Sequence, residues 1–167
     1  MSHLIIYASA HHGNTEKLGK AMAEQLKADI KKTNEVNGSI SQNYDLIGFG
    51  SGVYHGKFHA DLIRFIDSMP KVSGKKAFVF STSGSGNKKY NNVIEEKLKE
   101  KGFLVIGDFS CKGYDTYSIF KLIGGIAKGR PNAEDLQRAQ EFIEHIKQIR
   151  QKEQSVLCTH SRGQLLS

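Results

Sequence analysis

A turn near the start of the chain, residues 9–17, has the residue types and spacing of an anion-binding site. It reads S-A-H-H-G-N-T-E-K, follows an apolar run at residues 4–8, and opens a helical pattern that continues to Leu26. A helix that begins directly after a buried strand leaves its first backbone N–H groups unpaired and pointing at the turn. Such a turn binds an anion, most often a phosphate, and Gly13 lets the backbone approach that anion closely.

Two further loops have a similar composition. Residues 51–59 (S-G-V-Y-H-G-K-F-H) follow an apolar run at residues 45–50, and residues 81–87 (S-T-S-G-S-G-N) follow an apolar run at residues 77–80. All three loops are rich in Gly, Ser, Thr, Asn and His. The carboxyl ends of parallel strands meet at one edge of a sheet, so we expect the three loops to converge on one ligand. This convergence is a stronger indication than any single loop.

The loops need strands and helices to position them. Apolar runs predict five strands, at residues 4–8, 28–32, 45–50, 77–80 and 103–106. Helical spacing predicts helices at residues 15–26, 60–69 and 92–101, with Asn14 as the N-cap of the first, and a last helix capped by Asn132 and Asp135 whose core face runs to Ile149. Alternating strands and helices predict an α/β three-layer sandwich. Its five-stranded parallel sheet suits the order 2-1-3-4-5 and has helices on both faces.

The composition indicates one soluble domain. The 167 residues are 38% hydrophobic and 25% charged, which is ordinary for a globular protein. No apolar run approaches the ~20 residues of a transmembrane segment, and the N-terminus lacks the pattern of a signal peptide. Cys111 and Cys158 lie far apart, which favours a reducing, cytoplasmic location. We expect a domain over residues 1–150 and a poorly ordered C-terminal tail over residues 151–167.

The charge balance indicates the kind of partner. A formal net charge of +7 favours acidic partners. The lysines follow helical patterns and form no compact basic run with interleaved aromatic residues, so we do not expect nucleic-acid binding. No Ser–His–Asp arrangement, metal-ligand spacing or carboxylate pair stands out, and we assign no catalytic residue and no metal ligand.

Over roughly residues 3–149 the chain resembles the flavodoxin family. That family's phosphate signature is S/T-x-T-G-N-T, and the matching residues 10–15 read A-H-H-G-N-T. The glycine, asparagine and threonine agree with the signature, whereas Ala10 and His12 replace hydroxyl residues. The resemblance implies that the turn holds the phosphate of FMN through backbone amides, the Thr15 hydroxyl and an N–H of His12. The cofactor-binding residues implied here are Ser9, Ala10, His11, His12, Gly13, Asn14 and Thr15.

The other two loops resemble the family's ring-binding loops. The first implies contacts from Ser51, Gly52, Val53, Tyr54, His55 and Gly56, with Tyr54 at the position of an aromatic that stacks on the isoalloxazine. The alternative is that Tyr54 packs under the following helix. The second loop implies contacts from Ser81, Thr82, Ser83, Gly84, Ser85 and Gly86. It has no aromatic before Tyr90, so either Tyr90 folds back over the ring or the outer face of the ring is open. Residues 111–117 follow the last strand and would approach the flavin from the side.

Three functions remain open. The resemblance favours an electron-transfer protein that shuttles electrons between redox proteins with acidic docking surfaces. The second is an FMN-dependent oxidoreductase acting on a small molecule, because the loop at residues 50–59 is similar to that of flavodoxin-like protoporphyrinogen oxidases, which pass electrons to quinone. The third is a flavodoxin fold without bound flavin. His55, Lys57 and His59 flank the expected ring site, and positive charge there should make a bound flavin less reducing.

Overall fold

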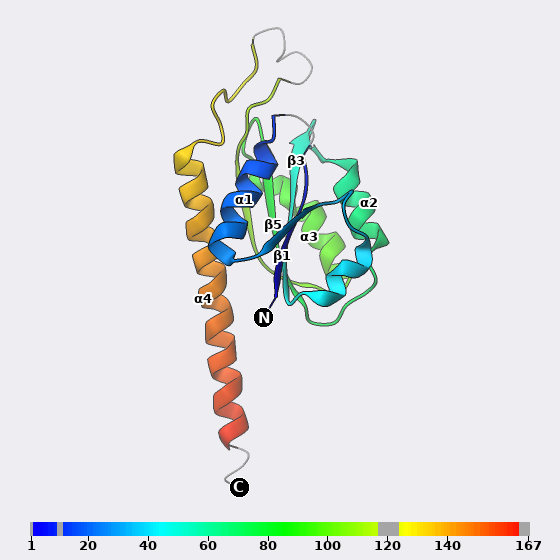
Figure 1. Ribbon diagram of the computed structural model, residues 1–167, viewed down its shortest axis with the longest axis vertical. Helices are drawn as coiled ribbons and strands as arrows, with labels where there is room; N and C mark the ends of the chain where they lie inside the picture. The colour runs from blue at the N-terminus through cyan, green and yellow to red at the C-terminus, as the bar shows by residue number, and fades with distance from the viewer. Residues whose placement is uncertain (1, 10–11, 117–123, 164–167) are drawn as a thin grey trace.

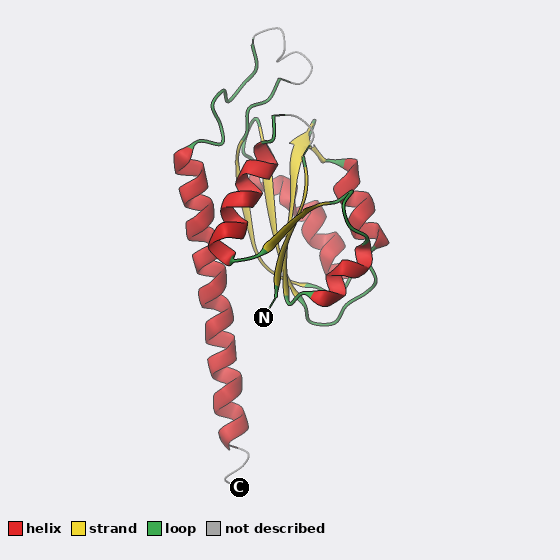
Figure 2. Ribbon diagram, in the orientation of Figure 1, coloured by secondary structure: helices red, strands yellow, loops and turns green. Residues whose placement is uncertain are grey.

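The protein is a three-layer α/β sandwich (Figures 1 and 2). The structure, a computed structural model, describes residues 2–9, 12–116 and 124–163. The strands are β1 (His3–Ala8), β2 (Asp29–Lys32), β3 (Leu46–Tyr54), β4 (Lys57–Phe58), β5 (Lys76–Ser83) and β6 (Leu104–Lys112). The helices are α1 (Asn14–Leu26), α2 (Ala60–Ser68), α3 (Asn91–Glu100) and α4 (Ala133–Gly163), with 3-10 turns η1 (Gly38–Asn43) and η2 (Lys88–Tyr90).

The sheet has the order β2-β1-β3-β5-β6, and each of these neighbours pairs in parallel. The predicted order 2-1-3-4-5 is therefore confirmed. The additional strand, β4, is two residues long and pairs antiparallel with the end of β3. Because all five long strands run in one direction, their carboxyl ends lie at one edge, where the three predicted loops also lie.

Two apolar layers hold the helices against the sheet. On one face, buried side chains of α1 and α4, among them Leu18 and Ile143, pack on Ile5, Phe78 and Phe80. On the other face, side chains of α2 and α3 pack on the opposite residues of the same strands. Helices thus cover both faces, as predicted, and the strands are buried on both sides.

β3 and β5 extend further than their apolar runs. The ladder between them continues through the pairs Ser51–Ser81 and Gly52–Thr82. The sequence prediction ended both strands too early, because small polar residues are typical of loops. In the fold these side chains are buried and hydrogen-bonded; for example, Ser51 Oγ lies 2.7 Å from the carbonyl oxygen of Gly52.

The last helix begins where predicted and ends later than expected. The capping box is confirmed, since the backbone N–H of Asn132 donates to Asp135 and the N–H of Asp135 donates to Asn132, both at 3.0 Å. The helix continues to Gly163, so residues 151–163 are helical, and Figure 1 shows this half extending beyond the sheet. Lys76 forms an ion pair with Glu153 of the extension. No helix within the described ranges is long and apolar enough to cross a membrane.

Candidate functional site

The turn between β1 and α1 leads directly into the N-terminus of the helix. His12 and Gly13 have left-handed φ angles of 58° and 64°. The helix follows at once, and the backbone N–H of Lys17 donates to the carbonyl oxygen of Gly13, at 2.9 Å. The N–H groups of residues 14–16 precede that bond, as at any helix N-terminus. Among the described residues, apart from its chain neighbours, no atom lies within 4 Å of the position that a Cβ on Gly13 would take.

Asn14 does not cap the helix as predicted. The N-cap is Gly13, which has no side chain, and Asn14 is the first helical residue. Its Nδ2 instead donates to the carbonyl oxygen of Tyr114, at 2.8 Å. Gly113 leaves room for this contact, because a Cβ there would lie 2.8 Å from the same Nδ2. The side chain that sequence reasoning assigned to the helix end therefore ties the turn to the segment after β6.

Thr15 faces the interior of the fold. Its side chain is 1% exposed, and its Oγ1 lies 2.9 Å from Oγ1 of Thr82 at the end of β5. The hydroxyl pair fixes α1 against the sheet, whereas the backbone amides and His12 remain at the mouth of the turn. Ala10 and His11 lie outside the described residues.

The segment after β6 lies against this turn. His12 Nε2 lies 2.8 Å from Oγ1 of Thr116, and the rings of His12 and Tyr114 are 4.6 Å apart. Lys17 Nζ donates to the carbonyl of Pro131, at 3.0 Å. The sequence indicated that residues 111–117 would approach the site from the side, and the structure places 113–116 there.

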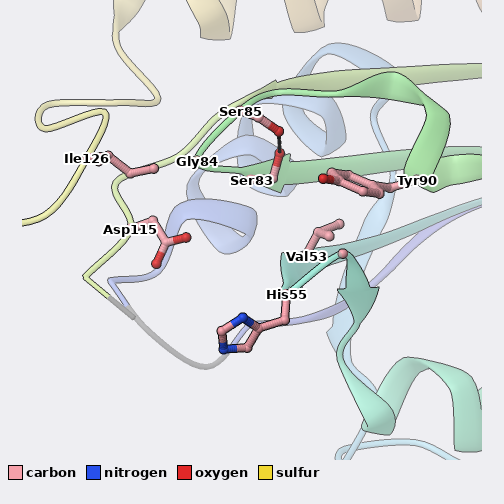
Figure 3. A pocket seen from close by; sticks show the side chains of 9 residues that line it. Val53, His55, Ser83, Gly84, Ser85, Tyr90, Asp115 and Ile126 are labelled. Carbon is pink, nitrogen blue, oxygen red and sulfur yellow. Dashed lines mark hydrogen bonds between the residues drawn. The ribbon is translucent and has the colours of Figure 1, made fainter. Parts of the chain in front are cut away.

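A cavity of about 350 Å³ opens beside the turn, at the carboxyl ends of β3 and β5 (Figure 3). This volume is in the range of small-molecule sites, ~300–1,000 Å³. Of the predicted ring-loop residues, six line it: Val53, His55, Gly56, Ser83, Gly84 and Ser85. Six others do not: Ser51, Gly52, Tyr54, Ser81, Thr82 and Gly86. Three described residues outside the predicted set also line it: Tyr90, Asp115 and Ile126.

The first ring loop is a tight hairpin rather than an open loop. Tyr54 pairs with Lys57 across a turn in which His55 and Gly56 have φ angles of 48° and 72°. Left-handed φ at both central residues is what a two-residue type I′ turn requires. Val53 and Gly56 therefore enter the cavity from a regular hairpin, whose rigidity the sequence alone did not indicate.

Of the two tyrosines considered for stacking, Tyr90 lines the cavity and Tyr54 does not. Successive strand residues point to opposite faces, and Val53 faces the cavity. Tyr54 lies over Gly52, where an added Cβ would be 2.5 Å from the Tyr54 hydroxyl. Its ring contacts His59 edge-on at 6.2 Å. Because β3 continues through residue 54, the parity of the strand turns Tyr54 away from the cavity, whereas η2 brings Tyr90 to it (Figure 3).

The wall opposite Tyr90 consists of Asp115 and Ile126. Their backbones form an antiparallel bridge, with N–H to carbonyl distances of 3.0 and 2.8 Å. Gly84 is packed against this wall, because a Cβ there would lie 2.4 Å from Cδ1 of Ile126. No local signal in the sequence identifies the bridge, since its two partners are far from both ring loops along the chain.

The charges at the cavity differ from the sequence expectation. Of the three basic residues expected around the ring, His55 alone lines the cavity. Lys57 lines a neighbouring cavity, and His59 caps α2 through its Nδ1, which accepts from the N–H of Asp61 at 3.2 Å. The Asp115 carboxylate adds an acidic group that was not expected there (Figure 3).

No group of three or more His, Cys, Asp or Glu side chains that could hold a metal occurs among the described residues. Cys111, near the end of β6, is buried. Burial, followed by the neighbouring Asp135 carboxylate, raises the pKa of its thiol to about 12. This cysteine is therefore protonated at neutral pH and is not a nucleophile.

Comparisons with known proteins agree with this geometry. A family model described as a flavodoxin domain matches residues 4–123. An uncharacterized protein of Methanocaldococcus jannaschii is 49% identical over 148 residues, which cover 87% of this chain and 98% of that protein. A flavodoxin of Maridesulfovibrio salexigens is 31% identical over 122 residues, which cover 63% of this chain and 81% of that protein.

Solved structures share the fold. Oxidised flavodoxin 2 of Bacillus cereus matches with a TM-score of 0.67 and 21% identity over 86% of this chain and 95% of that one. Oxidised flavodoxin 1 of the same organism matches with a TM-score of 0.64 and 24% identity over the same shares. The family match covers the turn between β1 and α1 and every described residue that lines the cavity except Ile126. The chain belongs to the flavodoxin family.

Proposed function

We propose that this flavodoxin-family chain binds FMN and acts as an electron carrier. The observation that carries the proposal is the convergence of three segments at the carboxyl edge of the sheet. The open helix N-terminus at Gly13 suits a phosphate, and the adjacent cavity suits a ring. Family membership supports a flavin as the group that needs both parts.

The described residues fit FMN. Backbone N–H groups of the turn, assisted by His12, would hold the phosphate, and Tyr90 and Ile126 would flank the ring system. Gly84 keeps the space between these walls, since any side chain there would reach Ile126. Hydroxyl and backbone groups of Ser83 and Ser85 would form hydrogen bonds with the polar edge of the ring.

FMN supplies the ability to accept and release electrons singly or in pairs. The protein's part is to bind the ring, exclude water from it and set the charge around it. His55 and Asp115 are the groups placed for the last task, and they act in opposite directions. A carboxylate disfavours added negative charge on the ring, whereas a protonated imidazole favours it.

Flavin binding is tested by titrating the purified, flavin-free protein with FMN and with riboflavin. We expect FMN to bind more tightly, because riboflavin lacks the phosphate that the turn would hold. Equal affinity would contradict the role of the turn, and absence of binding by either compound would refute the proposed function.

The carrier role is tested by electron transfer from the reduced holoprotein to electron-transfer proteins, in parallel with turnover of quinones and porphyrinogens. We expect rapid one-to-one oxidation by proteins and no sustained turnover of the small molecules. Sustained turnover would assign an FMN-dependent oxidoreductase instead. The net charge of +7 supports acidic redox partners.

A further inference from the structure

A second cavity adjoins the proposed flavin site. It measures about 380 Å³ and is lined by Gly56, Lys57, Phe58, Ala60, Ile63, Arg64 and Val93. Gly56 lines both cavities, so the two are separated by the hairpin turn at residues 55–56. The residues that line the second cavity come from the hairpin, from the start of α2 and from the first turn of α3. Figure 1 shows α2 and α3 on one side of the sheet.

The surface of this cavity is apolar and exposed. Val93 on the first turn of α3 is 57% exposed, and Phe58 and Ile63 lie beside it from the hairpin and from α2. An exposed aliphatic side chain such as Val93 contributes no hydrophobic stabilisation to the folded protein. Together with its apolar neighbours it forms one concave apolar spot, in contrast to the single apolar side chains that are common on protein surfaces.

Positive charge surrounds the apolar spot. Lys57 lines the cavity, and Lys89 precedes Val93 by four residues, which places the two on one side of the continuous η2–α3 helical segment. Neither lysine has an ion-pair partner in the described part of the chain. By contrast, Arg64 at the same cavity is paired with Asp61. The uncompensated charge of this surface is therefore positive.

We propose that this second cavity is the docking site for an acidic redox protein that inserts an apolar side chain. Its rim charges are Lys57, which lines the cavity, and Lys89, which lies one helical turn before Val93. This proposal rests on the proposed function. A partner docked in this cavity would lie beside the proposed flavin, because Gly56 lines both cavities. An apolar centre surrounded by charges that complement the partner is the usual arrangement of a binding hot spot. The lysines steer the partner, and the cavity fixes its orientation.

The first experiment uses an acidic b-type cytochrome as the probe and a basic c-type cytochrome as its counterpart. Binding of each oxidised cytochrome is measured by titration, and its reduction by the FMN-loaded, reduced protein is followed by stopped flow. We expect rates with the acidic cytochrome to fall as salt rises, by about tenfold or more over the range in which rim charges are screened. The basic cytochrome should show the opposite salt dependence.

Charge reversal locates the site. The variant K57E/K89E should lose about tenfold in binding and in the low-salt rate with the acidic cytochrome. The matched control is K31E/K71E, which makes the same change in net charge at two exposed lysines on β2 and in the turn before β5. Equal losses in the two variants, or binding of the acidic cytochrome that does not depend on salt, would overturn the proposal.

Removal of the apolar group tests the cavity itself. V93Q keeps a good helix former on α3 and should weaken binding severalfold, whereas L104Q changes a residue of similar exposure, 55%, at the opposite end of the sheet and should not. An unchanged affinity in V93Q would overturn docking at this cavity. The binding titrations do not require electron transfer. If the protein binds no FMN, the proposed function is refuted, and the titrations with the cytochrome still test the docking surface.

Discussion

Tyr90 and Tyr54 offer a direct test of the site, because the sequence pattern and the structure assign the stacking role differently. The substitution Tyr90→Leu removes the aromatic ring that lines the cavity and keeps a smaller apolar side chain at that position. Tyr54→Leu is the matched change on the other face of β3, where the ring lies over Gly52. Both tyrosines are half-buried, so the two variants lose similar amounts of packing.

The magnitudes follow from the position of each ring. An aromatic pair contributes ~0.5–1.5 kcal/mol beyond the area that it buries, which corresponds to about 2- to 12-fold in Kd. We expect Tyr90→Leu to weaken FMN binding by this amount. Tyr54→Leu should leave the affinity nearly unchanged and lower the free energy of unfolding instead, because its ring fills space above β3.

The assay is titration of the flavin-free variants with FMN, followed by the quenching of flavin fluorescence, together with chemical denaturation of each variant. The denaturation curves serve as the control for folding. If Tyr54→Leu lost as much affinity as Tyr90→Leu or more, the ring would lie on the Tyr54 side, and the assignment of the cavity would be refuted.

Three further outcomes are expected. Gly84→Ala should weaken FMN binding by about 5- to 140-fold, from ~1–3 kcal/mol of overpacking against Ile126, and adding Ile126→Ala should restore it in the same titration. Gly13→Val should abolish FMN binding with the fold retained, because a β-branched side chain disfavours the left-handed backbone of Gly13 and would occupy the space in front of the turn. Unchanged FMN binding in this variant would contradict the role of the turn. Burial, and then the guanidinium of Arg150, which lies 2.7 Å from Nε2 of His3, lowers the pKa of His3. The unfolded chain therefore takes up this proton first, and the free energy of unfolding should fall as the pH drops below about 6.5, by up to ~1.4 kcal/mol per pH unit. His3→Gln should flatten that dependence in denaturation curves, and an equal slope in both proteins would contradict the assignment.

The order of the sheet could be predicted because each piece of information is local. Apolar runs, helical spacing and the capping box of Asn132 and Asp135 are read within a few residues, and the rule for right-handed crossovers then restricts the topology. The turn between β1 and α1 could be located for the same reason, since strand, glycine and helix are consecutive. Strand ends were predicted less well. Ser51 and Ser81 resemble loop residues, and only the ladders on both sides of β3 and β5 show that they continue the strands.

The side chains that face the cavity depend on those strand ends. Had β3 ended at Gly50, Tyr54 would have been free to point at the cavity. Because pairing continues to residue 54, the alternation of the strand directs Val53 to the cavity and Tyr54 to the opposite face. A difference of a few residues in a strand boundary thus changes which side chain of the loop faces the cavity.

The contacts that complete the site are long-range. Asn14 contacts Tyr114, and His12 contacts Thr116, across separations of 100 and 104 residues. No spacing rule connects such positions, and the turn would be only a strand-to-helix connection without them. The segment after β6 joins the anion-binding turn to the cavity wall at Asp115, so a ligand that bridges turn and cavity would gain from contacts already made within the protein. The site is therefore pre-organised by the C-terminal third of the fold, although the residues that first indicate it lie near the N-terminus.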